Sequence, residues 1–314
     1  MEEKNKPSLS VLPRWWVKEA DVVETYGKAL KPFWLTFHDI ANPNNERTFI
    51  ATIIPGVAVG NTLPICEFGS HITTALELTL SSNLNTLVFD YVARLKISSR
   101  HFNFFIVKQL PVLLPSSYAQ LCLWFGGMQT LRDWLLPRLV ELTYTAWDLE
   151  PFAKDCGWSA PPFRWDEERR FLLRCELDAA FFHLYLMATP EGKWKRARAS
   201  EGAAHDELEE DLARLKARFP TPRDAVAYIM DTFPIVRRRD EEKYDGDYRN
   251  KRVILEIYDA MADSIRTGQP YQTRLDPPPG PPVEPLPDWP VGAKQPSAWP
   301  SHVHPPRHVV FRMD

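Results

Sequence analysis

Proline is concentrated near one end of this chain. Of the 29 prolines in 314 residues, 13 lie between Pro270 and Pro306, including the run PPPGPP at 277–282. Proline fixes φ at about −65° and has no N–H to donate, so such a segment neither continues a helix nor pairs inside a sheet. We expect residues 269–314 to form a proline-rich tail that is either an extended arm over the surface or disordered.

Strand and helix patterns alternate in the first 115 residues. Aromatic and β-branched residues dominate 32–37 and 48–55, which predicts two strands joined by a loop around residues 41–45. Apolar residues then recur every three or four positions over 72–95, which predicts a helix. The apolar segment 102–110 is predicted to be a further strand that ends at Pro111.

Helical periodicity dominates the next part of the chain. We expect long helices over residues 166–187, 207–219 and 248–265. Thr221 and Pro222 have the residue types preferred at the cap and the first position of a helix. The expected fold class is therefore α+β, with a mixed N-terminal module at 1–115, a mostly helical module at 116–268 and the proline-rich extended tail at 269–314.

Charge and cysteine content restrict the class of protein. The formal net charge is −3 at pH 7, so binding to nucleic acid would require a local basic patch. No C-x-x-C motif occurs, and we expect reduced thiols, as in a cytoplasmic protein. The four cysteines are Cys66, Cys122, Cys156 and Cys175. The N-terminal residues show no secretory signal, and charge and proline interrupt the most apolar stretch, so no transmembrane segment is predicted.

Familiar catalytic motifs are missing from the sequence. There is no Gly-rich phosphate loop, no G-x-S-x-G elbow and no Asn/Asp-Pro-Pro-aromatic motif, and the nearest match to the last, at 42–45, has turn chemistry. We therefore expect no catalytic residue on this chain. The alternative is a Mg²⁺-dependent DNA nuclease, in which Asp231, Glu241 and Lys243 would meet at adjacent strand ends.

The histidines are not expected to bind a metal. His302, His304 and His308 are close in the sequence, but the tail offers no scaffold for a metal site, so we expect them to be solvated. His183 lies on the apolar face of a predicted helix and is expected to pack in the core.

A stretch without acidic residues is the main indication of nucleic-acid binding. No Asp or Glu occurs between Asp90 and Asp133. Arg and Lys contact phosphates and set affinity, whereas side-chain amides can read base edges. The candidate phosphate contacts are Arg94, Lys96, Arg100 and Lys108. The candidates for base or other polar contacts are Asn85, His101, Asn103 and Gln109.

Structural explanations exist for the same residues. Cations at a helix end also complement the helix dipole, and Asn85 has the chemistry to cap or pin its helix instead of contacting DNA. The second basic run, at 237–239, is diluted by acidic neighbours, and we expect it to be an ion-paired surface.

Several segments, in series along the chain, carry a further pattern. They are 12–23 (LPRWWVKEADVV), 39–64 (DIANPNNERTFIATIIPGVAVGNTLP), 84–115, 174–186, 228–261 and 267–280 (TGQPYQTRLDPPPG). Together these segments resemble the target-recognition region and C-terminal end of large bacterial N6-adenine DNA methyltransferases. Those enzymes belong to restriction–modification and related phage-defence systems, including chains that fuse methylase and nuclease. The segment 84–115 also resembles type I specificity subunits.

The resemblance implies a DNA target-recognition module without its catalytic half. Such a module would hold double-stranded DNA and present side chains to the major groove while a methyltransferase domain or subunit flips out the target adenine. S-adenosylmethionine is implied for that missing catalytic part, and no cofactor is expected on this chain. A third alternative is a protein-interaction scaffold derived from the recognition fold, without DNA affinity.

Overall fold

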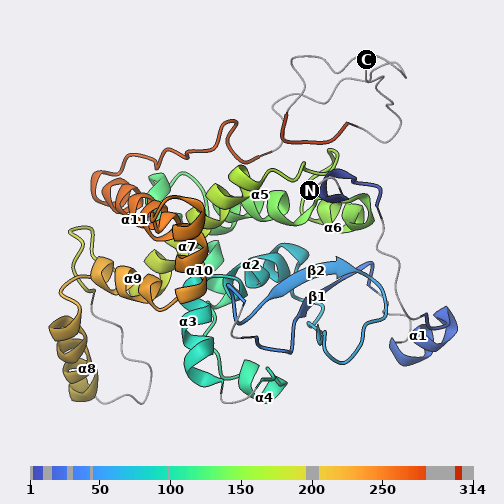
Figure 1. Cartoon of the computed structure of the whole chain (residues 1–314), viewed down its shortest axis with the longest axis horizontal. Coiled ribbons are helices and arrows are strands. Elements are labelled where there is room, and N and C mark those ends of the chain that lie inside the picture. Colours follow the sequence, from blue (N-terminus) through green and yellow to red (C-terminus); the bar gives the residue numbers. More distant parts are fainter. Residues whose placement is uncertain are drawn as a thin grey trace.

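The chain folds as an α+β protein in which helices predominate. The computed structural model describes residues 3–9, 16–26, 31–42, 45–97, 100–195, 205–280 and 301–305. Within them, one three-stranded antiparallel sheet lies among helices, which confirms the predicted fold class. The strands lie in the N-terminal part and the long helices follow (Figure 1).

The sheet has strand order β2-β1-β3. β1 (Phe33–Phe37) is central and pairs antiparallel with β2 (Ala51–Pro55) and with the short β3 (Ile65–Cys66). All five residues of β1 are buried, because helices and loops cover both faces. This burial explains why four of its five residues are apolar, and the buried hydroxyl of Thr36 donates to the carbonyl oxygen of Thr52 at 3.2 Å. The two strands predicted at 32–37 and 48–55 are thereby confirmed.

Helices account for most of the remaining described chain. The α-helices are α1 (Glu19–Tyr26), α2 (Thr74–Leu84), α3 (Leu87–Lys96), α4 (Phe104–Val107), α5 (Leu131–Thr143), α6 (Glu150–Asp155), α7 (Glu167–Leu186), α8 (His205–Arg218), α9 (Pro222–Asp231), α10 (Pro234–Lys243) and α11 (Arg249–Thr267). Short 3₁₀ turns are η1 (Glu3–Asn5), η3 (Pro115–Ala119), η4 (Leu123–Phe125) and η5 (Trp147–Leu149). The three long predicted helices correspond to α7, α8 and α11. Thr221 caps α9 in a capping box with Asp224, as the Thr-Pro pair predicts.

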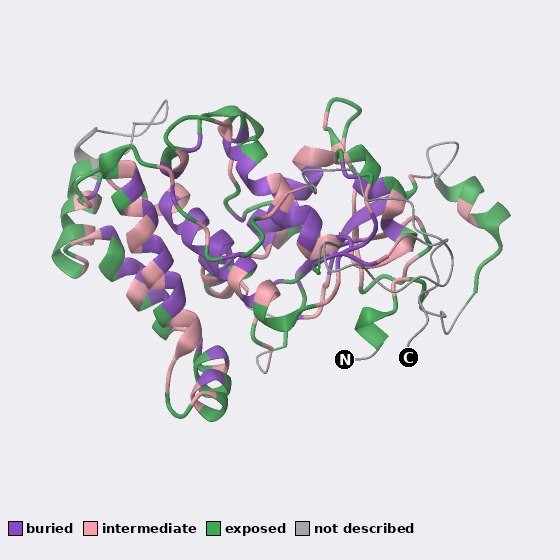
Figure 2. Ribbon diagram, turned by 90° about the horizontal axis from the view of Figure 1, so that it is seen from above, coloured by how far each residue is buried: buried purple, intermediate pink, exposed green. Residues whose placement is uncertain are grey.

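One continuous core joins the sheet to the helical part. Phe49, just before β2, stacks on Phe37 of β1 and makes edge contacts with Phe89 of α3 and with Phe102. The same cluster of buried residues extends through α5, α7 and α11. Figure 2 shows buried segments running through the centre of the molecule. The predicted boundary near residue 115 therefore falls inside a shared core, where neither side buries its apolar surface alone.

His183 occupies the middle of this core, as predicted. Its ring stacks on Tyr258 of α11 at 3.8 Å between centroids, and its Nε2 lies 2.9 Å from the carbonyl oxygen of Tyr258. Burial lowers the pKa of His183 to about 4. The ring is therefore neutral near pH 7 and packs as an aromatic core residue.

The single helix predicted over 72–95 is wrong in one respect, because the structure contains two helices. α2 ends at Leu84, and Thr86 caps α3 by accepting a hydrogen bond from the N–H of Phe89. Between them, Asn85 turns its amide toward β2. Both helices share one apolar pattern, which hides the break from periodicity alone.

The strand predicted over 102–110 is also wrong. Just before this segment His101 forms an isolated β-bridge with Ile40, and residues 104–107 form the short helix α4. The Oδ1 atom of Asn103 accepts a hydrogen bond from the N–H of Ile106 at 3.0 Å and so caps that turn. An N-cap followed by four apolar residues has the same composition as a strand, and here the cap determines the outcome.

The first part of the proline-rich tail follows the surface without regular secondary structure, in agreement with the extended arm. Tyr271 is its main attachment: its N–H donates to the carbonyl oxygen of Trp124 at 2.8 Å, and its hydroxyl donates to Glu176 at 3.0 Å. Glu176 in turn pairs with Arg138 at 2.8 Å, and all three side chains are buried. A buried carboxylate thus holds the tail against the helical part.

The expectation that the tail histidines are solvated is wrong for His302 and His304. Both are buried, because residues 301–305 pack against the body and Val303 forms a β-bridge with Phe163. The N–H of Arg164 donates to the carbonyl oxygen of His302 at 2.9 Å. His308 lies outside the described residues. Val303, two residues before the end of the described segment 301–305, belongs to the buried core and anchors the segment.

The four cysteines are free thiols, as predicted. Burial raises the pKa of Cys66 to about 11 and that of Cys156 to about 12, so these thiols are protonated near pH 7. In the part of the chain that the structure describes, no helix has the length and apolar character needed to cross a bilayer.

Candidate nucleic-acid interface

The predicted DNA-contacting residues lie mostly on one segment, which begins at the end of α3. We call residues 96–97 and 100–109 the basic arm; among the described residues it includes the end of α3, the helix α4 and its C-terminal turn. α4 lies on the side of the molecule opposite to α5 and α6 (Figure 1). The structure therefore presents this segment at an outer edge of the fold.

Backbone hydrogen bonds attach the arm to the segment after β1. The N–H of Ala41 donates to the carbonyl oxygen of Arg100 at 2.8 Å, and the N–H of Phe102 donates to Asp39 at 2.7 Å. The Nδ1 atom of His101 lies 2.6 Å from Oδ1 of Asp39, and the ring is exposed. This short ladder fixes both the loop and the direction of α4 relative to the sheet.

Arg94 is committed to the interior of the protein. Its Nε donates to Thr48 at 2.8 Å and to Asp90 at 3.1 Å, and its remaining nitrogens donate to backbone carbonyls. Its guanidinium also lies 4.1 Å from the ring centroid of Phe233. Because these contacts use the donors of the guanidinium, we leave Arg94 out of the proposed DNA-contacting set.

Asp90 is a structural residue that sequence reasoning missed. Its fully buried carboxylate accepts hydrogen bonds from the N–H groups of Thr48 and Phe49, at 2.9 and 2.7 Å, as well as from Arg94. Asp90 thus connects the segment ahead of β2 to α3. A lone carboxylate within an apolar helical stretch was the signal available, since a buried charge needs partners.

Three predicted phosphate contacts remain free in the described structure. Lys96, Arg100 and Lys108 are all exposed, and none forms an ion pair with another described residue. No acidic residue lies between Asp90 and Asp133 in the sequence, and the Asp39 carboxylate beside the arm contacts His101 at 2.6 Å. Their charge is therefore available to an external anion.

The second basic run differs in this respect. Arg237 pairs with Glu241 at 2.6 Å, Arg238 with Glu242 at 3.8 Å and Arg239 with Glu46 at 2.6 Å. This confirms the ion-paired surface predicted for residues 237–239. The basic arm and residues 237–239 each contain three exposed cations. Those at 237–239 form ion pairs, whereas those of the arm form none with the described residues.

The predicted amide contacts have structural roles. Asn85 bonds both backbone groups of Ala51, through Oδ1 at 3.1 Å and Nδ2 at 2.8 Å, and covers the outer edge of β2. This confirms that Asn85 pins its helix, and it leaves the amide no free face for a base. Asn103 caps α4, and the Nε2 of Gln109 donates to the carbonyl oxygen of Phe105 at 3.2 Å.

The residues of the nuclease alternative do not assemble as that alternative requires. Asp231 ends α9, whereas Glu241 and Lys243 lie on α10, so none is at a strand end. Both oxygens of Asp231 accept from Nζ of Lys251 at 2.7 Å. Within the described ranges, no three His, Cys, Asp or Glu residues are grouped as a metal site would need.

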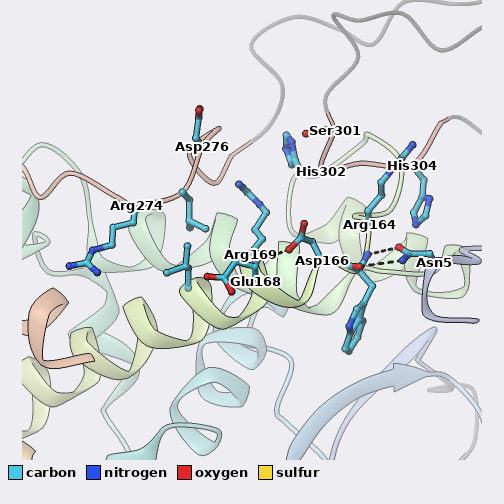
Figure 3. Close-up of a pocket in the computed structure, with 13 residues that line it drawn as sticks. Asn5, Arg164, Asp166, Glu168, Arg169, Arg274, Asp276, Ser301, His302 and His304 are labelled. Carbon is cyan, nitrogen blue, oxygen red and sulfur yellow. Dashed lines mark hydrogen bonds between the residues drawn. The ribbon is translucent and has the colours of Figure 1, made fainter. Parts of the chain in front are cut away.

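A cleft of about 780 Å³ lies at the start of α7, between η1 and the tail (Figure 3). Arginines and carboxylates alternate along it, and several are paired: Arg169 with Glu141, and Arg274 with Glu256 at 2.8 Å. Asn5 and Trp165 are hydrogen-bonded across one end. The cleft contains none of the predicted site residues, and its mixed, internally paired charges favour no particular ligand.

Comparison of the chain with protein-family models, with curated proteins and with solved structures yields no match. The functional conclusion below therefore depends on the residues and geometry of this chain and on the resemblance of its segments described above.

Proposed function

We propose that this chain is the DNA target-recognition part of a site-specific adenine-N6 DNA methyltransferase of a bacterial restriction–modification system. The catalytic methyltransferase domain or subunit, with S-adenosylmethionine as methyl donor, would be supplied from outside these residues. The observation that carries the proposal is the basic arm. Its three exposed cations are unpaired among the described residues, in a chain whose net charge is −3.

The charge distribution supports DNA as the ligand of the arm. A chain with negative net charge repels a polyanion unless cations are gathered at one place. Lys96, Arg100 and Lys108 are close in the sequence, and backbone hydrogen bonds of Arg100 and Phe102 attach this part of the chain to the segment after β1. Such cations contact phosphates and position the protein, while neighbouring polar groups are left to contact bases.

The order of segments that resembles methyltransferase recognition regions supports the more specific part of the proposal. In this view the helical part and the attached tail form the scaffold against which the catalytic part docks. Function in the cytoplasm, on double-stranded DNA, follows from the same proposal. This chain would contribute the specificity and affinity for DNA, and the catalytic partner would flip out the target adenine and methylate it.

The test is binding of the purified chain to a randomised duplex pool, followed by anisotropy at two salt concentrations. We expect affinity to fall by about a factor of ten or more between 50 and 200 mM salt if three or more phosphates are contacted. Repeated selection should enrich one sequence motif. Absence of binding at low salt, both alone and with a candidate methylase chain present, would contradict the proposal and favour the scaffold alternative.

A further inference from the structure

α4 exposes two aromatic side chains to different extents, Phe105 at 75% and Phe104 at 48%. Phe104 lies edge-on to the buried Phe37, with ring centroids 5.7 Å apart at 88°. Ile106 and Val107 pack against the core. Phe105, between Phe104 and Ile106, is the more exposed of the two rings. An exposed apolar ring gains free energy when another surface covers it, so Phe105 is available for contact with a ligand.

Two amide side chains hold the backbone that carries this ring. Asn103 caps α4 through the N–H of Ile106 at 3.0 Å, and Gln109 donates to the carbonyl oxygen of Phe105 at 3.2 Å. The backbone on both sides of Phe105 is therefore hydrogen-bonded, and its direction is set before any ligand arrives. A preorganised side chain loses little conformational entropy on binding.

The charges around Phe105 favour a polyanion as the covering surface. Lys108 follows it by three residues on a helical turn, so both side chains lie on the same face. Arg100 and Lys96 precede it on the same arm, and no acidic residue occurs from 91 to 132. A protein partner would have to match this excess of positive charge, whereas duplex DNA does so by its backbone and offers stacked apolar bases beneath it.

We propose that Phe105 is a wedge that inserts into a base step of duplex DNA while Lys96, Arg100 and Lys108 hold the flanking phosphates. This inference rests on the proposed function, since it names how the same arm engages DNA. Insertion of an apolar side chain unstacks the step and bends the duplex. The wedge would open the stack next to the site from which a base is to be withdrawn.

The test compares the Phe105→Ala and Phe105→Tyr variants with Leu95→Ala as matched control. Leu95 is 70% exposed on α3, beside Lys96, so its removal deletes a similar apolar surface without touching α4. The probes are duplexes of the selected sequence that carry 2-aminopurine at successive positions, because the fluorescence of this base rises when it is unstacked. Circular dichroism checks that each variant is folded.

The wedge predicts a rise in 2-aminopurine fluorescence at one step with the unmodified chain. Phe105→Ala should abolish that rise and weaken binding by about tenfold, whereas Phe105→Tyr and Leu95→Ala should keep both. Binding without any fluorescence change, or a Phe105→Ala variant that behaves as the unmodified chain, would overturn the wedge and leave the proposed function intact. Failure of the unmodified chain to bind DNA would overturn both. A change of oligomeric state on Phe105→Ala would assign the ring to contact with a second copy and also overturn the wedge.

Discussion

Arg47 and Asp178 connect the segment ahead of β2 to α7 by an ion pair of 2.8 Å. The side chain of Asp178 is 4% exposed, and its Oδ1 accepts a hydrogen bond at 2.7 Å from the N–H of Leu87, the first residue of α3. One buried carboxylate therefore binds both Arg47 and the first N–H of α3, next to the Thr86 cap. Because α3 leads into the basic arm, this pair links the helical part to the candidate interface.

Removal of the Asp178 carboxylate should destabilise the protein strongly. Asp178→Ala leaves the guanidinium of Arg47 and the N–H of Leu87 without their partner, and we expect a loss of about 3 kcal/mol in the free energy of unfolding. The control is Asp259→Ala, which breaks the exposed pair with Arg223 and should cost less than about 1 kcal/mol. Urea unfolding measures both. Equal costs for the two variants would contradict the role given to Asp178.

Asn85 should matter for stability and leave DNA affinity unchanged. Asn85→Ala removes both hydrogen bonds to Ala51 and exposes the edge of β2, which we expect to cost about 2 kcal/mol. The dissociation constant for DNA, measured where the variant is folded, should stay the same. Gln109→Ala, at an exposed position, serves as the stability control. A loss of affinity in folded Asn85→Ala would restore Asn85 as a DNA contact.

His302 should make stability depend on pH in mildly acidic solution. Burial lowers its pKa to about 4, from 6.5 for the free side chain, and neither ring nitrogen has a hydrogen-bond partner among the described residues. Between pH 6.5 and 4 the unfolded chain binds more protons than the folded chain, so stability falls as pH falls. Above pH 6.5 this contribution no longer changes with pH.

His302→Phe should remove that part of the pH dependence. A phenyl ring keeps the contact with Phe163, whose centroid lies 5.8 Å from that of His302, and cannot take up a proton. Unfolding midpoints of the variant and the unmodified chain, compared at pH 5 and pH 7.5, should differ more at the lower pH, with the variant more stable there. His71→Phe, at an exposed position, is the control. An identical pH dependence in all three proteins would contradict the account.

Local signals predict the long helices and the first two strands of this chain. α7 begins just after Asp166, whose side chain caps it, and Thr221 with Pro222 begins α9. In both cases the residues that determine the helix start are adjacent in the sequence, so a pattern shows them. The β1 strand is equally visible, because its burial on both faces requires a short apolar run.

Contacts between distant residues account for the wrong predictions. The break at Asn85 exists because Ala51, 34 positions earlier, offers both backbone groups to the amide. His302 is buried because Phe163 forms a bridge with its neighbour Val303. The sequence predicts Arg94 to be a free cation, whereas in the structure its Nε donates hydrogen bonds to Thr48 and Asp90. The periodicity and composition of one segment do not show which residues of a distant segment it contacts in the folded protein.

The most direct test of the central claim compares two triple variants with the unmodified chain. One replaces Lys96, Arg100 and Lys108 by glutamine, and the control replaces Arg237, Arg238 and Arg239 by glutamine. Both remove the same charge, the first from the unpaired arm and the second from cations that carboxylates already pair. The measurement is the affinity for duplex DNA as a function of salt concentration. The account predicts that the arm variant loses most of its affinity and that its salt slope falls by about 2 to 3, while the control keeps both. Equal losses in the two variants, or no loss in the arm variant, would contradict it.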